Sequence, residues 1–160
     1  MNDIDDILIE MGADPAMRGV ASDALRRKAE KLLIERMRTE LLTAPAEQLT
    51  GWKPWPSPSP LKADGEGRVT IPLPDDFLRL MSLRLSAWER PVTEILQPTH
   101  WLYKLQSQRW EGLRGTPRRP LAFAVADDAG RRCLQLYSAT PGSEVEIMAG
   151  WYLPEPKIDN

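Results

Sequence analysis

Residues 68–88 read RVTIPLPDDFLRLMSLRLSAW, and this stretch decides the fold of the second part of the chain. From Met81 onward apolar and polar residues alternate, which is typical of a strand with one buried face. Pro72 and Pro74 cannot donate hydrogen bonds to a β-ladder, so we expect the preceding strand to stop or to lie at an edge there. The stretch therefore predicts a β-rich domain.

The acidic pair Asp75 and Asp76 follows Pro74 and precedes the apolar residues Phe77 and Leu78. Acidic residues are favoured near the positive N-terminal end of a helix, so this order predicts a short helical turn. The segment can be a corner of a β-sandwich or a docking segment for a partner. Both interpretations stay open at this point.

Composition limits the classes of protein that the chain can be. Its 160 residues, 42% of them hydrophobic, are enough for one compact domain or for one domain with a helical arm. A net charge of −2 lacks the basic excess of a dedicated nucleic-acid binder. The acidic N-terminus has no signal-peptide pattern, and no apolar run reaches the length of a membrane span. We expect a protein without a membrane segment.

Two helices are predicted before the β-rich part. Asn2 can cap a short helix that ends at Gly12, and Ser22 can cap a longer helix that ends near Leu42. Both segments carry apolar residues at the three- and four-residue spacing of an amphipathic helix. The helical region is therefore assigned to residues 1–46.

A proline-rich stretch, residues 47–67, is interpreted as a linker, because closely spaced prolines remove backbone donors and keep the chain extended. Its aromatic residues Trp52 and Trp55 can either fill an aromatic groove of a partner or fold back onto the next domain, and we favour the second interpretation. The β-rich domain is assigned to residues 68–154 and a tail to residues 155–160.

The β-rich domain is predicted to be mainly antiparallel. Turn residues at 127–130 and 140–143 join the last three strand-like segments, which suggests a meander. One short helix is expected after Pro98. The fold class is therefore α+β, with N-terminal helices followed by an antiparallel β-sandwich or sheet that contains one inserted helix. The strand segments expected are 68–71, 81–88, 92–96, 121–126, 131–138 and 144–152.

Residues that could support catalysis are few and isolated. His100 and Cys133 are the only histidine and the only cysteine, so a zinc site built from these residue types is excluded. A helix start explains His100, and a buried strand position explains Cys133. The acidic pairs at 5–6, 75–76 and 127–128 fall at expected turns or helix starts, where aspartate is common without catalysis. We expect that the protein is not an enzyme and that it has no catalytic residue, metal or cofactor.

Basic residues cluster in two places, on the long helix at 26–38 and in the loop at 109–119. Acidic residues intersperse the helix cluster, which favours a solvated face or a contact with a partner helix there. The loop cluster is the better candidate for an acidic partner or for DNA. Its members are Arg109, Arg114, Arg118 and Arg119.

Residues 71–79, IPLPDDFLR, resemble a segment of the adaptor or ring proteins that join portal and tail in tailed bacteriophages, in particular the tail tubular proteins. The loop Gly115-Thr116-Pro117 and the closing strand at 150–154, GWYLP, are also similar to that family. The resemblance covers residues 68–154. The chain departs from it in having Arg118-Arg119-Pro120 where an aromatic residue is expected.

The resemblance implies a structural virion protein that forms part of a head–tail connector or tail ring of a phage or prophage. Its partners would be portal and tail proteins and further copies of itself in a ring. DNA would pass through the lumen of the ring, where the protein could contact it non-specifically. It would occur in the virion and, before assembly, in the cytoplasm of the bacterial host. The interface candidates are Arg26, Arg27, Arg36, Pro74, Asp75, Asp76, Phe77, Arg114, Arg118 and Arg119.

Two other functions stay open. A non-catalytic β-sandwich could bind a glycan or a peptide through exposed tryptophans, for which the candidates are Trp88, Trp101, Trp110 and Trp151. A small nucleic-acid-associated factor could act through the basic loop, and its binding would then weaken steeply with salt. Exposed rings would favour the binding module, whereas buried rings would indicate ordinary core packing.

Overall fold

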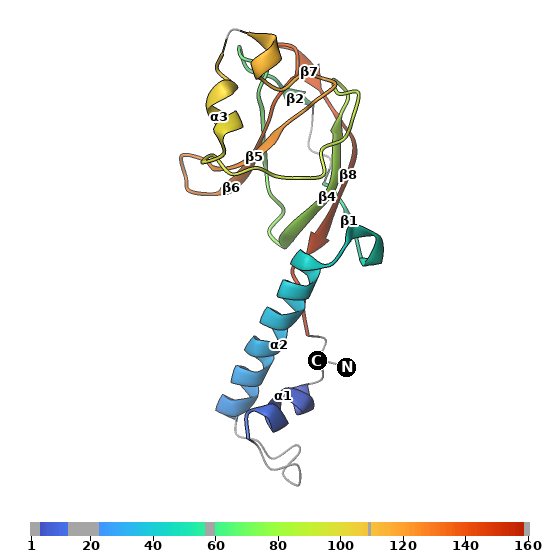
Figure 1. Ribbon diagram of the computed structural model, residues 1–160, viewed down its shortest axis with the longest axis vertical. Coiled ribbons are helices and arrows are strands. Elements are labelled where there is room, and N and C mark those ends of the chain that lie inside the picture. The colour runs from blue at the N-terminus through green and yellow to red at the C-terminus, as the bar shows by residue number, and fades with distance from the viewer. Residues whose placement is uncertain (1–3, 13–22, 57–59, 109, 159–160) are drawn as a thin grey trace. The chain divides into compact units, whose positions relative to one another are not determined.

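The computed structural model describes residues 4–12, 23–56, 60–108 and 110–158 and divides the chain into two compact units. The helical unit comprises Met1–Leu49 together with Glu155–Asn160, and the β-rich unit comprises Thr50–Pro154. The helices and the mainly antiparallel sheets confirm the predicted α+β fold. Figure 1 shows the order of the elements along the chain.

The helical unit contains α1 (Ile4–Glu10) and α2 (Asp23–Thr43), followed by a single 3₁₀ turn, η2 (Ala46–Gln48). Four side chains form its buried centre, and Ile158 from the end of the chain packs beside them. Those four are Ile7 and Leu8 of α1 and Ala29 and Leu33 of α2. The expected capping residues Asn2 and Ser22 lie outside the described residues.

The described residues of the β-rich unit form eight strands arranged in three small sheets. The strand order is β1-β8-β4 in the first sheet, β2-β7 in the second and β3-β6-β5 in the third, and each of these strand pairs is antiparallel. The strands are β1 (Lys53–Pro54), β2 (Leu61–Lys62), β3 (Val69–Pro72), β4 (Phe77–Leu85), β5 (Ala122–Ala126), β6 (Arg132–Leu136), β7 (Glu144–Val145) and β8 (Ile147–Pro154).

The predicted meander of the last three strand segments is wrong. β5 and β6 do form a hairpin, but the other neighbour of β6 is β3, while β7 pairs with β2 and β8 pairs with β1 and β4. The turn at 140–143 therefore joins strands of different sheets. Turn chemistry specifies where the chain reverses, but the pairing depends on which distant strand offers a matching buried face.

The segment expected to be a linker contributes to the β-rich unit. It supplies β1 and β2, and Trp55 within it is buried against Phe77 and Tyr152 at ring-centroid distances of 5.7 and 5.8 Å. Trp52 stays partly exposed. The proline-rich chain is held in place by the pairing of two short strands with β8 and β7 and by the buried ring of Trp55.

The predicted helical turn at residues 75–80 is wrong as well. Asp75 and Asp76 occupy a turn, in which the Phe77 amide donates to the Pro74 carbonyl, and strand β4 begins at Phe77. Buried side chains on β4 pair this strand with β8 along its length, so tertiary packing outweighs the local preference of the acidic pair. From Met81 to Leu85 the expected alternation of buried and more exposed residues is confirmed, but the strand ends there, and Trp88, which was expected on the polar face, is buried.

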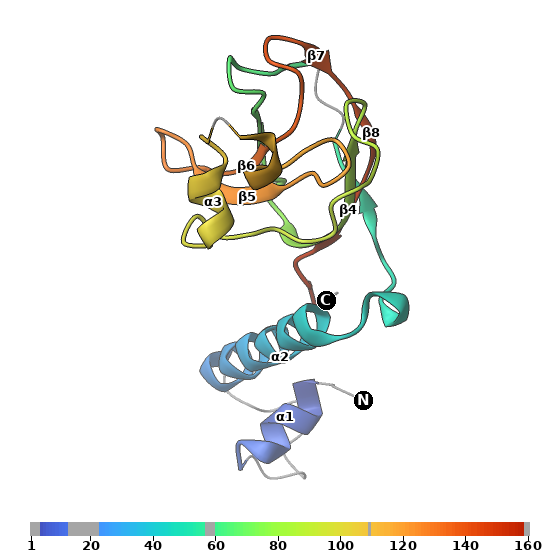
Figure 2. The ribbon, with the colours of Figure 1, turned by 45° about the horizontal axis from the view of Figure 1, so that its top comes forward.

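The segment between β4 and α3 also differs from the prediction. Residues 92–96 form only two isolated bridges, Val92 to Leu83 and Leu96 to Phe123, in place of the expected strand. The inserted helix α3 (Trp101–Leu105) is confirmed, and a 3₁₀ turn, η3 (Glu111–Leu113), follows it. Figures 1 and 2 both show α3 beside β5 and β6 and away from β4 and β8.

A single apolar core holds the β-rich unit together. Trp88 lies within it, 2% exposed, and its indole nitrogen donates to the carbonyl of Tyr137 at 2.9 Å. Gly150 of β8 is required by close packing, because a Cβ atom there would lie 2.6 Å from Cβ of Trp55. The core thereby ties the proline-rich segment to the last strand.

Candidate functional site

The two residues that could have supported nucleophilic or metal chemistry have structural roles. His100 caps α3, and its Nδ1 atom accepts a hydrogen bond from the Leu102 amide at 3.2 Å. Cys133 is buried on β6, and burial raises the pKa of its thiol. Both positions agree with the roles predicted from the sequence. Among the described residues, histidine, cysteine and acidic side chains form no group of three or more that could hold a metal ion.

The predicted acidic pairs lie apart in the structure. Asp5 and Asp6 fall in the first turn of α1, and Asp127 closes the β5–β6 hairpin. Its Oδ1 atom accepts from the amides of Ala129 and Arg131, and the backbone hydrogen bond from Arg131 lowers the pKa of Asp127. These hydrogen bonds stabilise the hairpin turn.

The interface candidates at residues 74–77 differ strongly from one another in exposure. Phe77 is buried among aromatic rings, whereas Asp75 is exposed. Asp76 accepts hydrogen bonds from Nζ of Lys53 at 2.5 Å and from the hydroxyl of Tyr152 at 2.8 Å, so it connects β1, the start of β4 and β8. The hydrogen bond from Lys53 lowers the pKa of Asp76.

Tyr152 is the second partner in this cluster. Burial, assisted by the hydrogen bond to Asp76, raises the pKa of Tyr152 to about 12. The phenol therefore stays neutral and acts as a donor at physiological pH. The conspicuous acidic motif of the sequence thus stabilises the end of the first sheet, and of its residues Asp75 presents its side chain to solvent most openly.

The interface candidates of the helical unit lie on α2. Arg26 and Arg27 are exposed, and Arg36 forms an ion pair with Glu10 of α1. The hydrogen bond from Arg36 lowers the pKa of Glu10. Arg36 therefore serves a contact within the helical unit, while the first two arginines face solvent.

The remaining interface candidates belong to the loop between α3 and β5. Arg118 forms an ion pair with Glu89 at 3.2 Å, and Arg119 is exposed. Arg114 is half-buried. Arg109, the fourth arginine of the predicted cluster, lies outside the described residues.

The same loop borders a shallow groove of ≈ 120 Å³, which we call the α3–η3 groove. Its lining combines apolar side chains with two cationic residues, Arg114 and Arg119. The lining residues are Trp101, Leu102, Leu105, Gly112, Leu113, Arg114, Gly115, Arg119 and Leu121. The groove exists because α3 packs on the third sheet, where the ring of Tyr103 contacts that of Phe123 at 5.1 Å.

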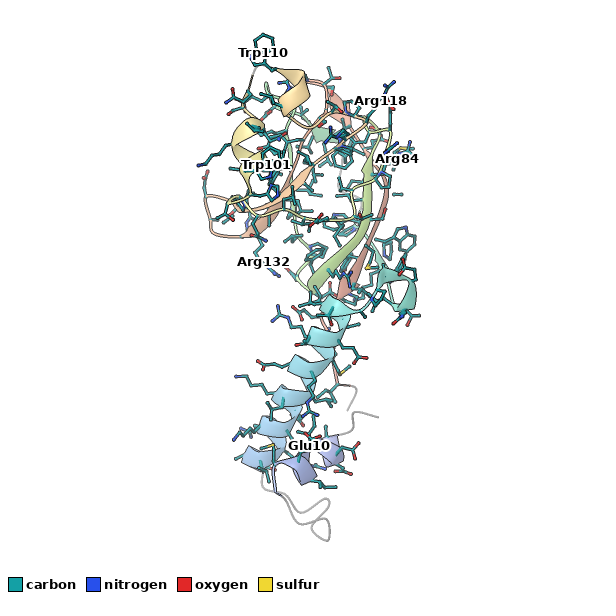
Figure 3. All side chains as sticks on the ribbon, viewed as in Figure 1. Glu10, Arg84, Trp101, Trp110, Arg118 and Arg132 are labelled. Carbon is teal, nitrogen blue, oxygen red and sulfur yellow. The ribbon has the colours of Figure 1, made fainter. Side chains whose placement is uncertain are left out.

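Large apolar side chains remain exposed at Trp101 and Leu113, which line this groove, and at Trp110, which precedes η3 and does not line it. Trp101 is 66% exposed, Trp110 is 74% exposed, and Leu113 is exposed as well. Figure 3 shows Trp110 projecting away from the ribbon and Trp101 on α3. Of the four tryptophans considered as ligand-binding residues, Trp88 is buried and the other three have exposed rings. The sequence identified the rings individually but gave no signal for the groove.

The unit also contains a pocket that sequence reasoning missed entirely. It has a volume of ≈ 270 Å³ and lies between the loop at 114–117 and the turn at 137–141. Ser138 lines it with a positive backbone φ of 83°, and no other non-glycine residue of the described chain has a positive φ. Neither feature has a local sequence signature.

Comparison with known proteins finds no family model, no curated protein and no solved structure that matches the chain. The fold and the surfaces therefore define its class. It is an α+β protein with a helical unit and a β-rich unit, and the β-rich unit carries an aromatic and basic groove. No helix in the described part of the chain is long and apolar enough to cross a membrane.

Proposed function

We propose that the chain is a structural subunit of a tailed-phage virion, acting in a ring that connects the head to the tail. The α3–η3 groove with its exposed aromatic rim carries the proposal. Exposed large apolar side chains on a soluble fold mark contact surfaces with other proteins, and tryptophan with arginine is the composition typical of interface hot spots. The likeness of residues 71–79 to ring proteins supports the same role.

The groove suits contact with another subunit. Trp101 and Leu113 in its lining, with the exposed Trp110 next to η3, provide apolar area that association would remove from water. Arg114 and Arg119 provide directional donors for a carboxylate or a carbonyl. A head-to-tail contact between copies closes into a ring when the angle between neighbours permits it. The well-packed core of the β-rich unit would hold such an angle constant.

The helical unit suits a second contact, with the portal or the next tail component. α2 spans 21 residues, yet only Ala29 and Leu33 of it are buried, and Arg26 and Arg27 are exposed. A partner could cover part of this helix. The exposed arginines could also contact DNA in the lumen, and salt-dependent retention on DNA would then be expected. A subunit of this kind requires no cofactor, metal or catalytic residue.

The test begins with the mass of the purified full chain, measured by light scattering after size exclusion, alone and with the portal and tail proteins encoded beside it. We expect either a large oligomer or co-elution with one partner. Trp101→Ala and Trp110→Ala should weaken that assembly. Met148→Ala is the matched control, because it removes an exposed apolar side chain on β8, outside the α3–η3 groove. A protein that stays monomeric and co-elutes with none of these partners would contradict the proposal.

A second function is favoured by the exposure of Trp101 and Trp110 in particular. These rings could stack on sugar rings or on a peptide in a non-catalytic binding module. The same two variants distinguish the proposals. In the binding module they would abolish binding to a glycan or peptide library while the wild-type protein remains a monomer throughout.

A further inference from the structure

One side chain joins the two walls of the α3–η3 groove. Gln106 follows α3 as its C-cap residue and is 5% exposed. Its Nε2 atom donates to the Leu102 carbonyl on α3 at 2.8 Å, and its Oε1 atom accepts from the Gly115 amide at 2.9 Å. Leu102 and Gly115 both line the groove, one on α3 and one after η3. This glutamine therefore fixes the position of one wall relative to the other.

The wall formed by residues 111–115, which we call the η3 segment, is otherwise weakly attached. Among the hydrogen bonds of the described groups, the one from the Gly115 amide to Gln106 alone joins this segment to another element. The chain is anchored again beyond it, where the Glu89 amide donates to the Pro117 carbonyl at 2.9 Å. The η3 segment is thus a short stretch between α3 and that anchor, with one polar attachment of its own.

The η3 segment also separates two hollows. Arg114 and Gly115 line both the groove of ≈ 120 Å³ and the pocket of ≈ 270 Å³ beside Ser138. The side chain of Leu113 is exposed. A stretch with a hollow on each side gains little from packing, and sparsely packed segments open at a low cost in free energy. The hydrogen bond to Gln106 is therefore the main contact that holds this wall in place.

The observed position of the η3 segment carries a cost at Ser138. The Oγ atom of Ser138 is buried and has no hydrogen-bond partner within the protein. A Cβ atom on Gly115 would lie 2.7 Å from this oxygen, so the glycine covers the hydroxyl at close range. A buried hydroxyl without a partner disfavours the state that buries it. Displacement of Gly115 would expose the hydroxyl to water and remove that cost.

Ser138 itself is the fixed side of this contact. The Tyr137 carbonyl accepts from the indole of Trp88 at 2.9 Å, and the Ala139 amide donates to the Gly67 carbonyl at 3.1 Å. These contacts on both sides of Ser138 hold its backbone at a positive φ of 83°, a conformation that serine rarely adopts without such constraint. The cost at the hydroxyl is therefore relieved by movement of the η3 segment and not by movement of the serine.

We propose that the η3 segment is a flap with a closed and an open state, and that Gln106 is the positioning residue that holds it closed against the buried hydroxyl of Ser138. The groove has its observed shape in the closed state, because Gly112, Leu113, Arg114 and Gly115 all belong to its lining. A partner that binds this shape stabilises the closed state, and the open fraction lowers its apparent affinity. This control of a subunit contact rests on the proposed function, whereas the opening itself does not.

The test is native-state hydrogen exchange of the isotope-labelled full chain, followed by NMR. It compares two amides after correction for their intrinsic rates. The Gly115 amide is protected by the bond to Gln106, and the Leu134 amide lies at the centre of β6, which pairs with strands on both sides. We expect Gly115 to exchange at least about a hundredfold faster than Leu134, because the flap opens without unfolding of the core.

Gln106→Met tests the residue that holds the flap closed. Methionine keeps the length of the side chain but removes both hydrogen bonds, so we expect exchange at Gly115 to become about tenfold faster relative to Leu134. Gln108→Met is the matched control, because Gln108 is an exposed glutamine two residues further along the chain. It should leave the ratio of the two exchange rates unchanged.

Ser138→Ala should act in the opposite direction, which loss of an ordinary structural contact would not do. It removes the buried hydroxyl, while the backbone strain is the same in both states of the flap. We expect exchange at Gly115 to become about tenfold slower relative to Leu134, because the closed state no longer buries an unpaired oxygen. Ser143→Ala is the matched control, since its hydroxyl already donates to the Thr140 carbonyl at 2.7 Å. It should not slow exchange at Gly115.

Three results would overturn the proposal. The first is a Gly115 amide that exchanges as slowly as Leu134 in the wild-type protein, which shows that the flap does not open by itself. The second is a Gln106→Met variant whose exchange at Gly115 matches that of Gln108→Met. The third is a Ser138→Ala variant in which exchange at Gly115 is unchanged or faster.

The flap and the proposed ring can fail separately. If the ring forms, Gln106→Met should weaken assembly in light scattering, although every side chain that lines the groove is retained. A wild-type chain that stays monomeric but shows the expected exchange rates would contradict the ring and support the flap. A chain that assembles while Ser138→Ala and Gln106→Met leave exchange unchanged would contradict the flap alone.

Discussion

The helical unit and the β-rich unit differ most in how much each one buries. Four described side chains form the buried centre of the helical unit, whereas sixteen form the core of the β-rich unit. A helix in water gains most of its stability from packing of its apolar face. Among the described residues of its unit, α2 packs against α1 and the end of the chain. The core of the β-rich unit is therefore large enough to stabilise its fold, whereas the helical unit depends on a small apolar contact between α1, α2 and the end of the chain.

This difference assigns different roles to the two units in the proposed ring. A well-packed unit can present a groove of fixed shape, as the α3–η3 groove requires. A weakly packed helical unit gains more from a partner that covers it, because binding to the folded form alone stabilises that form. We expect assembly to raise the stability of the helical unit more than that of the β-rich unit.

The largest expected effect comes from separating the units. A fragment of residues 50–154 should unfold cooperatively on heating, because it retains the whole core cluster of the β-rich unit. A fragment of residues 1–49 should show little helix by circular dichroism at the same temperature, since it also lacks Ile158. If the fragment of residues 1–49 melted cooperatively and the fragment of residues 50–154 did not, the helical unit would be the more stable of the two.

The next effect compares one leucine in each unit. Leu134→Ala should lower the free energy of unfolding of the β-rich unit by about 3 kcal/mol, because this fully buried leucine leaves a cavity. Leu33→Ala should reduce helix content but leave the fluorescence melting curve in place. All six tryptophans lie within residues 50–154, so fluorescence reports on the β-rich unit alone. A large fluorescence shift in Leu33→Ala would show that the units unfold together.

A smaller effect concerns the polar cluster that closes the first sheet. Asp76→Asn should destabilise the β-rich unit by about 1 kcal/mol at pH 7, because the charged acceptor for Lys53 and Tyr152 is lost. The measurement is urea unfolding followed by tryptophan fluorescence. An unchanged midpoint would show that these contacts contribute nothing in solution.

The same cluster sets a pH dependence with a definite sign. The pKa of Asp76 is lower in the folded state, so its contribution is present above its unfolded pKa of about 3.9 and is lost as the pH falls through the folded value. The pKa of Tyr152 is raised to about 12, so its contribution is present below about pH 10 and is lost as the pH rises toward 12. In a plot of the free energy of unfolding against pH, Asp76→Asn should flatten the acid side. Tyr152→Phe should flatten the alkaline side.

The smallest effect is expected at the surface of the helical unit. Arg36→Gln removes the ion pair with Glu10, which lies between two largely exposed side chains. Exposed ion pairs contribute little, and salt screens them. The thermal midpoint of the helix signal should change only slightly at low salt and not at all at high salt. A shift comparable to that of Leu33→Ala would mean that charge, and not packing, holds α1 on α2.

Features that depend on neighbouring residues were mostly predicted well from the sequence, and the helical turn expected at Asp75 and Asp76 is the exception. The periodicity of α2, the helix start at His100 and the turn at Asp127 each arise from side chains within one or two turns of the chain, and each is confirmed. Features that depend on distant partners were not. The strand at 92–96 and the meander were wrong because pairing is decided by matching buried faces far apart in sequence.

The candidate surfaces follow the same division. Composition pointed to tryptophan and arginine at 101–119, but only the packing of α3 on the third sheet brings Trp101, Leu113 and Arg114 around one groove. The sequence pattern at Asp76 suggested a docking motif, and the structure shows it bound to Lys53 and Tyr152. An acidic residue is available to a partner only when no internal donor reaches it, and the sequence does not contain that information.

The sequence by itself determined that this chain has N-terminal helices, an antiparallel β-rich part and a short inserted helix, because periodicity and turn chemistry act over a few residues. The tertiary structure alone decided the inclusion of the proline-rich segment in the β-rich unit, the burial of Trp88, the α3–η3 groove and the strained position of Ser138. Each of these depends on contacts between distant segments, whose free energy is set by shape and burial and not by local preference.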